Sequence, residues 1–228
     1  KIDLIICPSE FMRKKLATDK ALKDKLKVLY NFLEEGGTQT GDEPCEKEDY
    51  VLYFGRFAKE KGIETLLEAC RRLPEIPFIF AGSGELEKEL KGAKNVKNVG
   101  FQKGEELKNL IGRAQFSIFP SEWYENCPYS VMESQLYGTP VVASRIGGVP
   151  ELVEDGITGE LFTPGDVDDL KSKIENLWND KEKQKACSAN CRKKKFVSAR
   201  EYVITLTELY EGLGKDAFLS ACYGGKNE

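Results

Sequence analysis

Short apolar runs alternate with segments of helical periodicity along most of the chain. Strands that are apolar throughout and separated by single helices are typical of a parallel sheet covered on both faces. The predicted strands are residues 3–7, 27–30, 51–54, 78–81, 96–99, 116–119 and 141–143. The predicted helices are residues 9–16, 62–73, 86–90, 105–113, 128–137, 166–178, 181–194 and 198–212.

The order of these elements predicts an α/β fold. Right-handed crossovers between parallel strands give a doubly wound, Rossmann-like sheet, expected over residues 49–195. Residues 35–48 are rich in Gly, Thr, Asp, Glu and Lys and have no apolar periodicity, which indicates a linker. A helix and tail are expected over residues 196–228. Doubly wound sheets bind ligands beyond the carboxyl ends of their strands, so functional residues are expected in the loops that follow the strands.

Composition narrows the chemistry that these loops can carry. The chain has 228 residues and no histidine, which excludes Ser-His-Asp triads and Cys-His pairs. Its net charge of -4 argues against nucleic acid as a partner, so any phosphate site must be local. Seven cysteines without a C-x-x-C pair predict reduced thiols in a cytoplasmic protein. No apolar run approaches the length of a membrane span.

The loop after the strand at 51–54 carries two cations. Its sequence is G-R-F-A-K-E-K-G, and the glycine at the strand end allows a ligand close to the backbone. Arg56 carries a planar guanidinium that can donate two parallel hydrogen bonds, and Lys61 carries a compact ammonium charge. Together they are suited to binding a diphosphate. The alternative is two solvated surface cations, because Lys and Arg are mostly exposed.

A second loop, A-G-S-G-E at residues 81–85, has the start of a phosphate-binding pattern. Glu87 stands where the G-x-G-x-x-G motif needs its third glycine. A tight strand-to-helix turn is therefore the better interpretation.

A third loop, E-N-C-P-Y-S-V-M-E, places carboxylates at Glu125 and Glu133. Proline is favoured in the first turn of a helix, so a helix is expected to begin near Pro128, with Glu125 before it and Glu133 inside it. The free N–H groups at the helix start form an anion site between the two acids. A nucleotide sugar has the matching layout of ribose, two phosphates and hexose. Two solvated glutamates are the alternative.

As a set, these motifs resemble the carboxyl-terminal half of GT-B glycosyltransferases of family 4, the retaining "group 1" transferases. The resemblance covers residues 50–177 in the family's order. It rests on G-R-F-A-K-E-K-G, F-I-F-A-G-S-G, N-V-G-F, the Glu125-x7-Glu133 spacing, Y-G-T-P-V-V-A-S-R-I-G-G-V-P-E and G-I-T-G-E-L-F. Residues 1–34 resemble the last part of the family's amino-terminal domain, the bulk of which is therefore expected to be missing.

The resemblance implies sugar transfer from a UDP-sugar or GDP-sugar, with retention of configuration and without a metal or other cofactor. Arg56 and Lys61 would hold the diphosphate and stabilise it as leaving group, Glu125 would contact the transferred sugar, and Glu133 would bind the ribose. These roles make Arg56, Lys61 and Glu125 the implied catalytic residues. Further contacts to base, sugar and phosphate are implied at Val99, Phe101, Asn126, Ser130 and Val131.

The resemblance also implies partners. The acceptor would be a glycan or a lipid-linked molecule held by the missing amino-terminal domain, so this chain alone is expected to be inactive. The full-length enzyme would act in the cytoplasm, with peripheral association to a membrane, in polysaccharide biosynthesis. E-N-C-P-Y-S replaces the family's glycine-rich E-G-F-G type loop, which leaves the sugar open. Two alternatives remain: a nucleotide-sugar-binding module without chemistry, and an NAD-dependent oxidoreductase, disfavoured by the incomplete G-x-G-x-x-G motif.

The sequence Asp166-Val167-Asp168 has the D-x-D pattern that binds metal in another glycosyltransferase fold. It follows Pro-Gly and precedes an amphipathic helix, so Asp166 is predicted to cap that helix. Metal chemistry would require two acids converging on a substrate-bound ion. We therefore expect no metal site here.

Overall fold

The computed structural model describes residues 2–34 and 46–213. They fall into two compact units. The sheet unit comprises residues 46–195, and the terminal unit comprises residues 2–34 and 196–213. Most of the expected linker, residues 35–45, lies outside the described residues.

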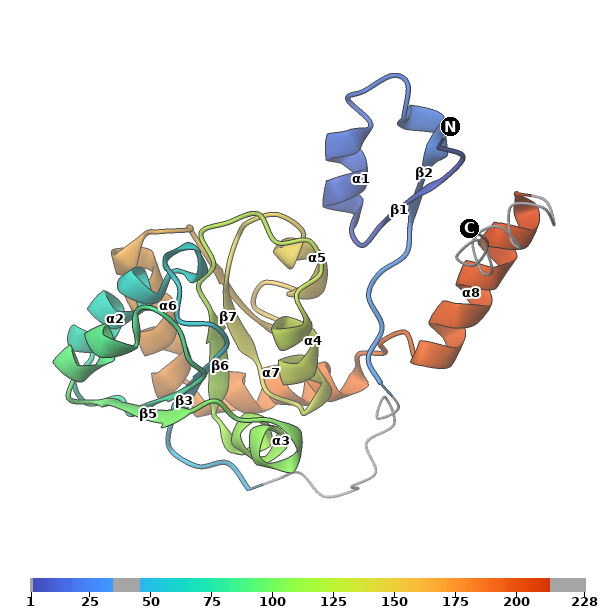
Figure 1. Ribbon diagram of the computed structural model, residues 1–228. Helices are drawn as coiled ribbons and strands as arrows, with labels where there is room; N and C mark the ends of the chain where they lie inside the picture. Colours follow the sequence, from blue (N-terminus) through green and yellow to red (C-terminus); the bar gives the residue numbers. More distant parts are fainter. Residues whose placement is uncertain (1, 35–45, 214–228) are drawn as a thin grey trace, which may run out of the picture. The chain divides into compact units, whose positions relative to one another are not determined.

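Six parallel strands form the sheet within the described residues of the sheet unit (Figure 1). They are β3 (Val51–Phe54), β4 (Phe78–Ala81), β5 (Val96–Gly100), β6 (Phe116–Phe119), β7 (Val141–Ser144) and β8 (Gly159–Phe162). Their order is β5-β4-β3-β6-β7-β8, so the direction of winding reverses between β3 and β6. This is the doubly wound order, which confirms the predicted fold.

Helices cover both faces of the sheet (Figure 1). Helix α2 (Ile63–Arg71) and α6 (Val167–Asn179) pack on one face, while α3 (Gly104–Arg113) and the end of α4 (Tyr129–Leu136) pack on the other. Helix α7 (Lys181–Lys193) packs against α4 and α6. The shorter elements are the 3-10 turns η2 (Lys59–Lys61) and η3 (Glu87–Gly92) and the helix α5 (Val149–Leu152).

The central strand β3 is apolar throughout because both of its faces are buried. In β3, Val51 and Tyr53 pack into the core with α2 and α6, and the alternating Leu52 and Phe54 pack with α3. All four residues are buried. Strand β8 was not predicted, because Glu160 interrupts its apolar run, and α5 is too short to give a periodicity.

The terminal unit pairs two short parallel strands, β1 (Ile5–Cys7) and β2 (Leu26–Val28). Its other elements are α1 (Glu10–Leu16), η1 (Lys23–Lys25) and α8 (Ala199–Gly212). Ser9 caps α1, because its hydroxyl accepts a hydrogen bond from the N–H of Met12 at 3.1 Å. The Phe32 and Tyr202 rings lie 4.9 Å apart, and this contact ties α8 to the segment after β2. No helix in the described part of the chain is long and apolar enough to cross a membrane.

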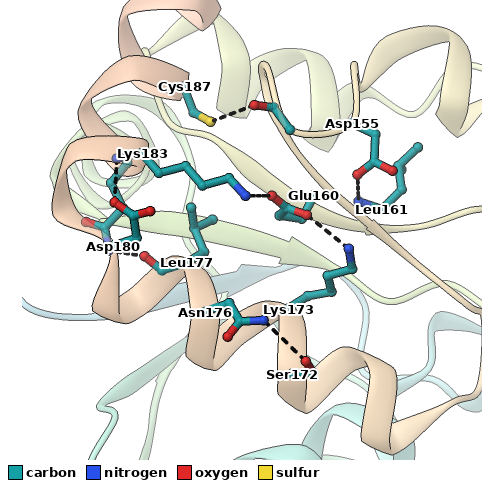
Figure 2. A network of polar contacts seen from close by, with 12 residues as sticks. Asp155, Glu160, Leu161, Ser172, Lys173, Asn176, Leu177, Asp180, Lys183 and Cys187 are labelled. Atoms are coloured by element: carbon teal, nitrogen blue, oxygen red, sulfur yellow. Dashed lines mark hydrogen bonds and ion pairs between the residues drawn. The ribbon is translucent and has the colours of Figure 1, made fainter.

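A buried carboxylate ties the edge of the sheet to two helices (Figure 2). Glu160 of β8 is only 6% exposed and lies between Lys173 of α6, at 3.1 Å, and Lys183 of α7. The bond from Glu160 raises the pKa of Lys183. An inward-pointing charge on an edge strand also disfavours pairing with a foreign strand.

We expect Glu160→Gln to lower the free energy of unfolding by about 1–3 kcal/mol, because two ammonium groups lose their buried partner. Denaturant unfolding at neutral pH measures this. Glu175→Gln is the matched control, since its pair with Lys171 is more exposed and should contribute less than about 1 kcal/mol. The Lys183 contribution should persist below its ordinary pKa of 10.5 and be lost as pH rises through its higher folded-state pKa. Equal losses in the two variants would contradict a structural role for the Glu160 pairs.

Candidate active site

A hollow of about 310 Å³ lies where β3 and β6 end, at the reversal of strand order. This is the location at which doubly wound sheets bind ligands. Its lining comes from β3 and the loop after it, from β6 and the loop after it, and from the start of α4. The polar lining residues are Tyr53, Arg56, Lys61, Ser121, Tyr129, Ser130 and Glu133.

Glycines bring the loops around the hollow into contact. Gly62 has φ +68°, and a Cβ on it would lie 1.9 Å from the carbonyl oxygen of Pro120. Gly82 and Gly84 of the A-G-S-G stretch pack in the same way against the carbonyls of Gly55 and Phe57. The A-G-S-G stretch is thus a tight turn that supports the loop carrying Arg56 and Lys61.

Glu125 is held on several sides. Its carboxylate pairs with Lys61 and accepts a hydrogen bond from Ser121 at 3.0 Å. Its carbonyl accepts from the N–H of Gly148 at 2.7 Å, and a Cβ on Gly147 would lie 2.1 Å from that carbonyl oxygen. Gly147 therefore allows the two loops to meet, and the Glu125 side chain is held beside the hollow by Lys61 and Ser121.

The two predicted cations differ in their surroundings. Arg56 is 64% exposed and pairs with Glu60 at 2.6 Å. The side chain of Lys61 is only 27% exposed. Both line the hollow, Arg56 as its exposed cation and Lys61 as its more buried one.

Glu133 lies in the second turn of α4 and lines the hollow. No hydrogen bond or ion pair to its carboxylate occurs among the described residues, and burial raises its pKa above the ordinary 4.5. Helix α4 begins at Tyr129 after Pro128, close to the predicted start, and no side chain caps it. Its first N–H groups therefore complement the site with partial positive charge.

Several predicted contacts do not line this hollow. Val99 packs with the core on the α3 face and lines a separate hollow, and Phe101 is 71% exposed. Val131 is fully buried, so only its backbone could reach a ligand. Asn126 is half-buried in the loop before α4 and is absent from the lining. Roles for these four residues stay predictions.

Tyr53, Ser121 and Glu60 belong to the site but were not identified from the sequence. Tyr53 lies in an apolar strand, yet its hydroxyl donates a hydrogen bond to the carbonyl of Arg56 at 2.8 Å. Burial raises the pKa of Tyr53, so it is a neutral donor at physiological pH. Ser121 lies in a loop with no recognisable pattern, and Glu60 lies inside the G-R-F-A-K-E-K-G motif, of which only the two cations Arg56 and Lys61 were given a role.

The D-x-D stretch lies at a helix start, as predicted. The Asp166 side chain accepts from the N–H groups of Asp168 and Asp169, each at 3.0 Å, which confirms its capping role. Asp168 pairs with Arg72 at 2.8 Å. Within the described ranges, no cluster of three or more His, Cys, Asp or Glu residues is arranged to hold a metal ion.

Comparison with known proteins identifies the family. Residues 41–194 match the family described as "Glycosyl transferases group 1". The chain belongs to this family. Among similar curated proteins, a sulfoquinovosyl transferase from Arabidopsis thaliana is 37% identical over 139 residues. The match covers 58% of this chain and 27% of the length of that protein. An uncharacterized glycosyltransferase from Methanocaldococcus jannaschii is 30% identical over 220 residues, covering 92% of this chain and 60% of its own length.

Solved structures of similar proteins share the fold of this chain. HepE from Anabaena, in complex with UDP, superposes with a TM-score of 0.78 at 24% identity and covers 92% of this chain and 63% of its own length. The fold of the sheet unit is thus that of GT-B glycosyltransferases. The chain spans less than two thirds of the length of each of these relatives.

Proposed function

We propose that the chain is the carboxyl-terminal, donor-binding half of a retaining family 4 glycosyltransferase that uses a UDP-sugar or GDP-sugar. The observation that carries this proposal is the hollow between β3 and β6, where two cations and a helix start meet Glu133, whose carboxylate has no partner among the described residues. Similar structures solved with UDP, with UDP and glucose, and with UDP-glucose support a donor of this class.

In this proposal, each part of the donor has a partner. The diphosphate lies against Arg56, Lys61 and the start of α4, where charge-assisted bonds and helix N–H groups favour an anion. Glu133 accepts hydrogen bonds from the ribose hydroxyls, which its unpaired carboxylate can do without breaking an existing contact. Glu125, fixed by Lys61 and Ser121, faces the transferred sugar.

The chemical step follows from the same residues. The bond between the sugar C1 and the diphosphate oxygen breaks, and Arg56 and Lys61 stabilise the charge that develops on the leaving group. The acceptor hydroxyl forms the new bond to C1 on the same face, and its proton passes to a phosphate oxygen. We propose that no metal takes part, because the Asp166 and Asp168 carboxylates are engaged in capping and in the pair with Arg72.

The acceptor surface is proposed to come from the remainder of the enzyme. Transfer requires both substrates in one water-poor cleft, which supplies a large part of the barrier reduction. The chain alone should therefore bind donor nucleotide but transfer no sugar to a glycan or lipid-linked acceptor. The free cysteines of the described residues fit the proposed cytoplasmic setting.

Calorimetric titration tests the proposal directly. UDP, GDP, uridine, guanosine and NAD are added separately to the 228-residue chain. We expect one nucleoside diphosphate to bind at least about tenfold more tightly than its nucleoside, because the diphosphate adds charge-assisted bonds. Tighter binding of NAD than of either diphosphate would favour an oxidoreductase and reject the proposal.

Glu133→Gln should separate function from stability. The loss of the carboxylate should weaken UDP or GDP by about tenfold, since charged hydrogen bonds to the ribose are lost. The same change should raise stability at neutral pH, because an ionised Glu133 with a raised pKa costs folded-state free energy above pH 4.5.

The pH dependence of nucleotide affinity tests the role of Glu133 independently. Nucleotide affinity of the unmodified chain should fall as pH drops through the Glu133 pKa, above 4.5, and the Gln variant should lack this component. Calorimetry between pH 4.5 and 7.5 and thermal unfolding measure both effects. A variant that loses affinity and stability together would show that Glu133 is structural.

A further inference from the structure

A second hollow, of about 450 Å³, lies elsewhere on the sheet unit. Its lining includes Gln115, which directly precedes β6, whereas the candidate active site lies beyond the carboxyl end of that strand. The strand itself spans roughly 13 Å at about 3.3 Å per residue. The second hollow is therefore separate from the candidate active site.

One face of α7 supplies most of its lining. The lining positions on α7 recur at helical spacing, at Lys181, Gln184, Lys185, Ser188 and Arg192. A helix packed on a domain normally carries apolar residues at this spacing. Here Gln184 and Ser188 are polar although only 5% and 6% exposed, and the neighbouring Cys187 and Cys191 anchor the helix in the core. Helix α7 thus turns a polar, partly buried face toward the hollow.

The hollow is basic in an acidic chain. Seven of the described residues line it, of which four are cations (Lys47, Lys181, Lys185 and Arg192) and none is an acid, although the net charge of the chain is -4. In the described part of the chain, Asp49 lies 4.0 Å from Lys181 and Glu182 lies 2.9 Å from Lys185 at its rim. Both pairs are well exposed, so they neutralise the hollow only weakly.

The floor of the hollow is built on the turn after α4. Ser188 donates to the carbonyl of Gly138 at 2.6 Å, and Lys47 donates to Thr139 at 2.8 Å. Arg192 lies across Gly138, where a Cβ would come within 2.7 Å of its guanidinium. Among the described residues Arg192 makes no hydrogen bond or ion pair, so the donors of its planar fork are available.

We propose that this hollow binds a phosphate-bearing anion. A half-buried guanidinium and flexible ammonium groups around one cavity match the several acceptor oxygens and the double charge of phosphate. The same chemistry occurs in a free phosphate compound and in an anionic phospholipid headgroup. This site does not depend on the donor proposal.

Two binding assays distinguish these sources. Pyrophosphate is titrated calorimetrically into the chain in the presence of saturating UDP, and sedimentation compares vesicles of phosphatidylcholine with vesicles that also contain phosphatidylglycerol. Lys185→Gln combined with Arg192→Gln should weaken binding by about tenfold, the loss of at least one charge-assisted hydrogen bond. Lys88→Gln combined with Lys91→Gln, on the exposed turn η3, makes the same charge change and should leave binding unaltered.

The outcomes separate cleanly. A selective loss of pyrophosphate binding assigns a free phosphate compound, and a selective loss of binding to phosphatidylglycerol vesicles assigns a lipid headgroup. The comparison of the two double variants isolates the hollow whether or not UDP occupies the candidate active site. If the Arg192 change impairs folding, Lys181→Gln with Lys185→Gln alters only the exposed rim and should still weaken binding about threefold. No binding in either assay, or equal losses in hollow and control variants, overturns the proposal.

Discussion

Gly62→Ala is expected to lower the free energy of unfolding by about 3–5 kcal/mol, a large share of the stability of an ordinary domain. The left-handed backbone at φ +68° costs an alanine about 1–2 kcal/mol. The remainder comes from the new Cβ, which would lie 1.9 Å from the Pro120 carbonyl oxygen. Because that atom belongs to the backbone, the two loops must separate. Denaturant unfolding followed by circular dichroism measures the loss.

Gly156→Ala is the matched control. Gly156 has φ +76°, close to that of Gly62, but nothing lies within 4 Å of its would-be Cβ. In this variant the free energy of unfolding should fall by only about 1–2 kcal/mol, the cost of the left-handed backbone for alanine. The difference between the two variants then reports the contact between the loops that carry Lys61 and Glu125. Equal losses would mean that the loops can separate without cost.

Most of the fold could be predicted from the sequence, because the buried strands and amphipathic helices have strong patterns. Strands β3 and β4 were predicted to the residue, since a strand made only of apolar residues has no polar position to obscure its limits. Strand β8 was missed in the prediction because it contains a polar residue, Glu160. Glu160 is buried there only because Lys173 and Lys183 reach it from two helices, and no local pattern encodes such long-range pairing.

The candidate site was predictable where its residues follow strands or open a helix. Arg56, Lys61 and Glu133 were identified in this way and all line the hollow. The ion-pair partners of these side chains could not be predicted, because the partners are distant in the sequence. The pairing of Lys61 with Glu125 and the lack of a partner for Glu133 among the described residues appear only when β3, β6 and α4 are brought together.

The pairings of the two cations also predict unequal roles. A diphosphate that displaces Glu60 from Arg56 releases a mostly exposed pair, which costs little and gains little. Lys61 is more buried and remains linked to Glu125, so a phosphate beside it interacts in a less hydrated environment. Lys61 should therefore contribute more to diphosphate binding than Arg56.

Lys61→Ala is expected to weaken UDP or GDP, whichever binds, by roughly 10- to 150-fold, which corresponds to a charge-assisted bond of about 1.5–3 kcal/mol. Binding of the matching nucleoside should hardly change, because Lys61 faces the diphosphate. Arg56→Ala should give a smaller, several-fold loss. Calorimetry with nucleoside and nucleoside diphosphate in parallel provides the ratio that isolates the phosphate contribution.

Lys59→Ala is the control for long-range charge, since Lys59 is exposed on the same turn, η2, and does not line the hollow. Removing it changes the net charge by the same amount, and its small effect should vanish in 0.5 M salt, where exposed charges are screened within about 4 Å. The Lys61 loss should persist in that salt, because a phosphate in direct contact is screened much less. Equal losses for the nucleoside and its diphosphate in Lys61→Ala would instead make Lys61 a support for Glu125, and the diphosphate would then have to be held by Arg56 and the start of α4 alone.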